Sequence, residues 1–167
     1  MKKVLFCTLL VFLAVGWVSC RKETSIENGK GLATDMVATI DGVSWEAADS
    51  TQTAVISNGL VTISGISPDG QEISITLNNT AIGAYGLNQT SPSLAIYANL
   101  DSVGSYAYST NQGSDTSQAG GTVNVTALDD VNRTISGIFS FKTYRNSDGS
   151  QKNITAGVFY NIPYVEE

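Results

Sequence analysis

Hydrophobic and polar residues alternate with a period of two along most of the chain after residue 35. The clearest case is the stretch 71–77, where Ile73, Ile75 and Leu77 share one side of an extended strand and polar residues share the other. Such alternation is typical of an antiparallel strand with one buried and one solvated face. No stretch of ten or more residues shows the apolar period of a helix, so the pattern predicts an all-β domain.

Turn signals separate these strands. Asp-Gly at 41–42 and Asn-Gly at 58–59 each stand between two apolar runs, and both pairs suit a two-residue hairpin because both turn positions need a positive φ. The expected strands are 36–40, 43–47, 53–57, 60–64, 71–77, 83–87, 94–98, 105–109, 122–127, 133–144 and 153–164. About nine to eleven short strands with regular turns predict a single antiparallel β-sandwich or barrel-like domain, and periodicity does not choose between the two.

The last two predicted strands are the longest. The strand 133–144 carries large apolar residues on one face and is the expected centre of the core: Ile135, Gly137, Phe139 and Phe141. Continued alternation through 153–164 predicts one shared face for Ile154, Ala156, Val158, Tyr160 and Ile162.

The first twenty residues follow a different pattern. Lys2 and Lys3 precede an apolar run over 4–15, and small or apolar residues then lead to Cys20. This order is typical of a secretory signal, and the run is shorter than the roughly 20 residues of a membrane-spanning helix. The sequence therefore predicts a signal peptide over 1–19, a lipidated cysteine and flexible linker over 20–35, and an all-β domain over 36–167.

Residues 18–20, Val-Ser-Cys, resemble the start of a bacterial lipoprotein, in which the cysteine thiol carries the lipid. Trp17 departs from the usual Leu, Val or Ile. The resemblance implies that Cys20 is the lipid acceptor, that membrane lipid is a partner, and that the protein is anchored in the cell envelope, at the outer membrane on either face. The alternative is a soluble secreted protein that is cut nearby.

Charge and composition exclude several functions. After the signal, seven basic residues face fifteen acidic ones, a net charge near −8, and no Lys or Arg occurs between Gly31 and Asn132. Nucleic acid needs cations opposite its phosphates, so we expect no nucleic-acid partner. The chain has no histidine and, beyond Cys20, no thiol in the mature part. Ser-His-Asp and Cys-His catalysis and structural zinc are therefore excluded, and we expect no cofactor and no metal.

Four stretches of strand resemble a family of uncharacterised Bacteroidota lipoproteins with an all-β domain of unknown function. The first is Ala-Thr-Ile-Asp-Gly-Val-Ser-Trp at 38–45, and the others lie at 121–126, 134–141 and 154–164. The resemblance covers about residues 36–164. It implies the fold and offers no catalytic residue.

Four aromatic residues are candidates for stacking on a ligand. Tyr106 and Tyr108 are two apart, so they share a face of one strand. Together with Tyr97 and Trp45 they form a possible stacking surface for sugar rings. The alternative is that these rings are buried in the core.

Two short motifs and one acidic pair complete the candidates. Asp-Ser-Thr at 49–51 and Asp-Ser-Val at 101–103 resemble sites of O-glycosylation in exported Bacteroidota proteins, which makes Ser50 and Ser102 candidate acceptors. Asp129 and Asp130 fit a turn or a calcium ligand, and a turn is the commoner use of such residues.

We therefore expect a non-catalytic module of the cell envelope that binds a glycan or an envelope protein. Two alternatives remain open at this stage. One is a structural or accessory subunit of an envelope assembly, and the other is a hydrolase that uses two carboxylates.

Overall fold

A computed structural model describes residues 34–100, 106–114 and 117–167. The predicted signal peptide, Cys20 and Ser102 lie outside these residues. The described part is all-β, as predicted, with one short 3₁₀ helix, η1 (Asp49–Thr51). Its strands are β1 (Asp35–Ile40), β2 (Val43–Glu46), β3 (Thr53–Ser57), β4 (Leu60–Ile66), β5 (Gln71–Leu77), β6 (Gly83–Leu87), β7 (Leu94–Asn99), β8 (Tyr106–Ser109), β9 (Gly120–Asp129), β10 (Thr134–Tyr144) and β11 (Gln151–Glu166).

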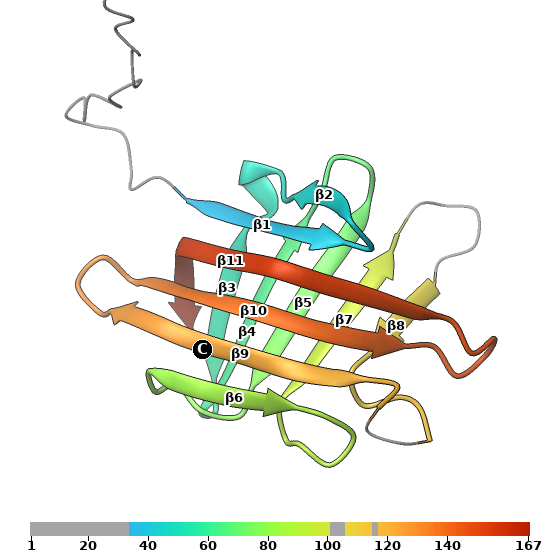
Figure 1. The fold of residues 1–167 in the computed structure, drawn as a ribbon. Coiled ribbons are helices and arrows are strands. Elements are labelled where there is room, and N and C mark those ends of the chain that lie inside the picture. Colours follow the sequence, from blue (N-terminus) through green and yellow to red (C-terminus); the bar gives the residue numbers. More distant parts are fainter. Residues whose placement is uncertain (1–33, 101–105, 115–116) are drawn as a thin grey trace, which may run out of the picture. The chain divides into compact units, whose positions relative to one another are not determined.

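The strands form one sheet that closes on itself. The hydrogen-bonded ring runs through β11, β3, β4, β5, β7, β8 and β10 and returns to β11. From this ring β1 and β2 branch off β11, and β9 and β6 branch off β10. In Figure 1, β2, β1, β11, β10, β9 and β6 form one layer, and the remaining strands pass crosswise behind it. The fold therefore combines the closure of a barrel with the two layers of a sandwich.

Both predicted two-residue hairpins are present. Asp41 and Gly42 have φ values of 49° and 86°, and Asn58 and Gly59 have values of 51° and 80°. Two successive residues with positive φ match the twist of the flanking strands, which is why Asp-Gly and Asn-Gly occupy these turns. They join β1 to β2 and β3 to β4.

The single face predicted for 153–164 is wrong, because β11 contains two bulges. Ala156 and Asn161 have φ values of 49° and 50°, and the pairing of β11 with β10 shifts register beside both residues. Each bulge adds one residue and so reverses which side chains point inward. The buried residues of β11 are Ile154, Gly157, Phe159, Ile162 and Tyr164, whereas Ala156 and Tyr160 are exposed.

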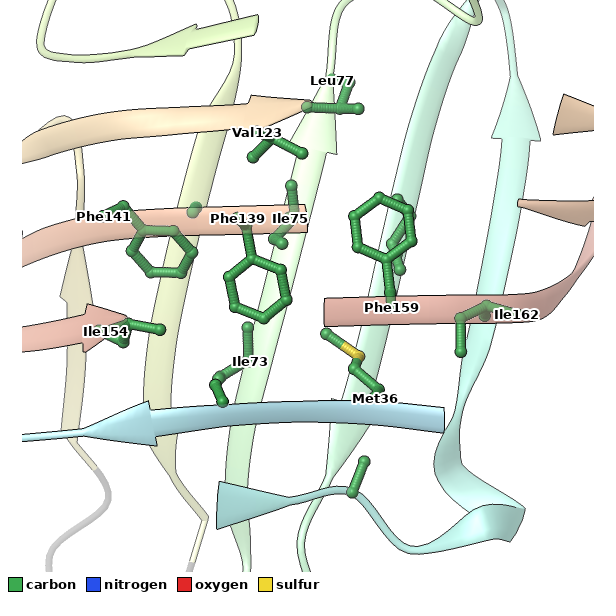
Figure 2. Packing of buried hydrophobic residues seen from close by; sticks show 14 of the residues in the cluster. Met36, Ile73, Ile75, Leu77, Val123, Phe139, Phe141, Ile154, Phe159 and Ile162 are labelled. Carbon is green, nitrogen blue, oxygen red and sulfur yellow. The ribbon is translucent and has the colours of Figure 1, made fainter. Parts of the chain in front are cut away.

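The core lies between the two layers, and β10 is at its centre as predicted. Phe139 on β10 stacks against Phe141 and Phe159, with ring centroids 5.7 and 6.3 Å apart. Figure 2 shows these rings close to Met36 on β1 and Ile73 on β5, which belong to the same buried cluster. No cysteine follows Cys20 in the sequence, so no disulfide can form within the β domain and burial of this apolar surface carries its stability. Within the described residues, no helix is long and apolar enough to cross a membrane.

A candidate binding pocket beside the β1–β2 hairpin

A pocket of about 920 Å³ opens at the end of the molecule where the β1–β2 hairpin approaches the rear layer. One wall is β2 and the chain that follows it as far as Asp49. The opposite wall is the β4–β5 turn with the neighbouring ends of β7 and β8. The lining residues are Ile40, Asp41, Val43, Ser44, Trp45, Glu46, Ala47, Ala48, Asp49, Ser67, Pro68, Asp69, Gln71, Tyr97, Asn99, Tyr106 and Lys152.

Gln71, the first residue of β5, joins the two walls. The indole N–H of Trp45 donates to its main-chain carbonyl at 3.2 Å, and the Tyr97 hydroxyl donates to its Oε1 at 3.0 Å. Its own Nε2 donates to Asp69 in the β4–β5 turn. Buried aromatic N–H and O–H groups need such partners. Reasoning from sequence missed Gln71, because one glutamine at the start of a strand carries no signal of its own.

The four candidate stacking residues do not form one exposed surface. Trp45, Tyr97 and Tyr108 are buried, with 4%, 3% and 4% of their surface exposed, and only Tyr106 is half-buried at the rim of the pocket. Tyr106 and Tyr108 meet edge to face, with centroids 5.5 Å apart. The Arg145 guanidinium carbon lies 4.9 Å from the centroids of both rings. Tyr106 is therefore the one ring of the four that a ligand in the pocket can reach.

Carboxylates dominate the charge of the pocket. Asp41, Glu46, Asp49 and Asp69 line it and are exposed, and Lys152 is the one cation among the described residues that line it. Lys152 is already paired with Asp41 at 2.8 Å. The lining thus carries an excess of negative charge.

Hydrogen bonds keep two of these carboxylates ionised. Desolvation raises the pKa of Asp41, but bonds from the Lys152 ammonium and the Asn153 amide outweigh it, and the net pKa is lowered. For Asp69, the bond from the Ser67 hydroxyl is the main reason that its pKa is lowered.

Tyr97, in contrast, stays neutral. Desolvation, followed by the nearby tyrosines and carboxylates, raises the pKa of Tyr97 to about 12. Its hydroxyl is therefore a permanent donor to Gln71.

The remaining candidates do not line the pocket. Ser50 is exposed within η1 and is accessible for modification. The carboxylate of Asp129 accepts bonds from the amides of Val131 and Asn132, as expected for a turn residue. Asp130 accepts a bond from Tyr164 at 3.0 Å. Among the described residues, no group of three or more His, Cys, Asp or Glu side chains is placed to hold a metal ion.

The described residues thus define a closed β domain with a polar, acidic cleft beside the β1–β2 hairpin. A family model matches residues 34–163, and the chain belongs to this family, which is described as a domain of unknown function (DUF6252). No curated protein and no solved structure matches the chain.

Proposed function

We propose that this protein is a lipid-anchored, non-catalytic binding module of the cell envelope, and that its ligand occupies the pocket beside β2. The observation that carries the proposal is the pocket itself. Its volume of about 920 Å³ lies within the range of small-ligand sites, and its lining combines carboxylates and amides with one accessible ring, Tyr106. An aromatic ring beside hydrogen-bonding groups suits a ligand with both apolar and polar surface.

The state of the carboxylates favours binding over hydrolysis. A general acid that works near neutral pH needs a pKa raised toward that pH. The pKa values of Asp41 and Asp69 are instead lowered, so both are ionised hydrogen-bond acceptors. In this state they attract donors and cations and hold no proton to deliver.

The sequence around Cys20 supports the anchor. Cys20→Ala is expected to abolish incorporation of an alkynyl fatty-acid label and to release the protein from the membrane fraction. Cys7→Ala is the matched control, because Cys7 lies in the apolar run of the signal, and this variant is expected to keep the label. Label retained on Cys20→Ala would refute lipidation at this residue.

The pocket is tested with the full-length lipoprotein in detergent on glycan and peptide arrays. Tyr106→Ala removes the accessible ring, while Tyr160→Ala removes a ring that is 53% exposed on β11 and does not line the pocket. We expect array signals that weaken in Tyr106→Ala and persist in Tyr160→Ala, with both variants folded by circular dichroism. Glycan signals that are the same in wild type and Tyr106→Ala would show that the glycan binds elsewhere.

A further inference from the structure

β2 has one open edge. In Figure 1 it is the last strand of its layer, and within the described part of the chain it pairs only with β1. The amide of Ala47 donates to the carbonyl of Met36 at 3.0 Å. Backbone groups of an antiparallel strand alternate in direction, so Val43 and Trp45 turn theirs toward β1. Ser44 and Glu46 therefore turn their N–H and C=O groups away from β1, toward the open edge.

This open edge borders the pocket. Every residue from 43 to 49 lines it, and the opposite wall is the β4–β5 turn with the ends of β7 and β8. The other terminal strand of the sheet, β6, differs, because the Ser91 hydroxyl donates to its Gly86 carbonyl at 2.6 Å. Unpaired main-chain groups beside a cleft are the arrangement that proteins use to bind an extended peptide as an added strand.

Charge indicates the kind of peptide. Among the described residues, the ion pairs are Arg145 with Asp148 and Lys152 with Asp41. No described cation therefore neutralises the exposed carboxylates of Glu46 and Asp49 at the edge of the cleft. A second copy of this chain would bring like charges together across the new strand pair, which is unfavourable. A peptide with Lys or Arg complements the same carboxylates.

We propose that the pocket binds an extended peptide segment of a partner protein, which adds a strand to the open edge of β2 and places Lys or Arg side chains against Glu46 and Asp49. This inference rests on the proposed function, because it names the ligand class of the same pocket. Main-chain pairing with Ser44 and Glu46 holds the peptide, and the carboxylates select its charge.

The decisive variant is Ser44→Pro with Ser44→Ala as its control. Proline removes the outward N–H of residue 44 and leaves the pairs that β1 makes with Val43 and Trp45, whereas alanine keeps the N–H. The probe is an array of short peptides in which Lys or Arg alternates with Val or Thr, and the same peptides with Glu in place of the cations. We expect the wild type and Ser44→Ala to bind the basic set, and Ser44→Pro to bind about tenfold more weakly or worse.

Two further measurements keep the inference falsifiable if Ser44→Pro does not fold. Two N-methylated versions of the best basic peptide are compared, one modified at the odd-numbered residues and one at the even-numbered residues. One version is expected to lose binding, because its methyl groups replace the N–H groups that face β2, and the other is expected to bind. Hydrogen exchange of the Ser44 and Glu46 backbone amides with solvent, measured by NMR, is expected to be fast in the free protein and slow in the complex. If both N-methylated versions of the peptide bind, or if amide hydrogen exchange at Ser44 and Glu46 stays fast in the complex, strand addition is overturned.

Charge variants test the selection. Glu46→Gln with Asp49→Asn is expected to reduce binding of the basic peptides and to flatten its dependence on salt. Equal binding of the Glu-containing peptides would overturn the inference while leaving a peptide site. A glycan signal that depends on Tyr106, with no basic peptide bound, would overturn the inference and leave the proposed function standing. If neither array gives a signal that depends on Tyr106 or Ser44, the inference and the proposed ligand site are both refuted.

Discussion

Two reciprocal glycine–phenylalanine pairs link β10 and β11 in the core, and they allow a quantitative test of the packing. Phe139 on β10 pairs with Gly157 on β11, and Gly137 on β10 pairs with Phe159 on β11. A Cβ atom at residue 157 would lie closer than 3.0 Å to the Phe139 ring, a separation that Cβ atoms do not adopt. Each ring therefore occupies the space that a side chain on the opposite strand would need.

Gly157→Ala is expected to destabilise the domain by about 2–3 kcal/mol, the upper part of the range for overpacking a core. The value is high because Phe139 is 3% exposed and is stacked on both sides, so its ring has little room to move. Residue 157 does not have a left-handed φ, so alanine fits the backbone and only the lack of space opposes it. Urea unfolding followed by far-UV circular dichroism measures the loss.

Gly86→Ala is the matched control, because a Cβ at that strand position meets nothing within 4 Å. It is expected to be neutral or to stabilise by up to about 1 kcal/mol through the unfolded chain. The double variant Gly157→Ala/Phe139→Leu is expected to be about 1 kcal/mol more stable than the sum of the two single losses predicts, because the smaller side chain leaves room for the new methyl group. A Gly157→Ala variant as stable as Gly86→Ala would refute the packing argument.

Three smaller predictions follow from single groups. Because the pKa of Tyr97 is raised to about 12, the free energy of unfolding is expected to fall as the pH rises from about 10 to 12. Tyr97→Phe is expected to lessen that fall and, at neutral pH, to cost about 1 kcal/mol for the bond to Gln71. Lys152→Met is expected to cost less than about 1 kcal/mol at pH 7, because the pair with Asp41 is partly exposed. Since the pKa of Asp41 is lowered, this cost is expected to shrink in urea titrations as the pH falls below the usual pKa of an aspartate, about 3.9. Gly59→Ala is expected to cost about 1–2 kcal/mol in thermal unfolding, because its φ is 80°.

Local pattern was enough to place the strands. Alternation located the strand at 71–77 with the bounds that β5 has, and the Asn-Gly pair located the β3–β4 hairpin. Both signals act between near neighbours in the sequence, and the period of two directly reports which side chains are buried. The same signals placed the core strand β10. Its large apolar residues are buried except Ile138, which is exposed.

Closure of the sheet and the pocket depend on contacts that the pattern does not encode. The end of β11 pairs in parallel with β3, more than one hundred residues away in the chain. The pocket likewise joins β2 to a turn and two strand ends through Gln71. Trp45 and Tyr97 are residue types that often stack on ligands. Their positions in the strand alternation face inward, however, so their rings are buried in the core.

The bulges of β11 show why its alternation misled, and they provide the final test. Glycine often occupies the bulge position that needs a positive φ, because it has no Cβ. In this chain the residue there is Ala156, with a φ of 49°. An alanine in this conformation costs about 1 kcal/mol, so Ala156→Gly is expected to stabilise the domain by about 0.5–1 kcal/mol in urea. Ala127→Gly, at an exposed position of β9 without positive φ, is expected to destabilise by a similar amount. If both variants lose stability equally, residue 156 is not in the left-handed conformation, and the register of β11 with β1 and β10 must be different.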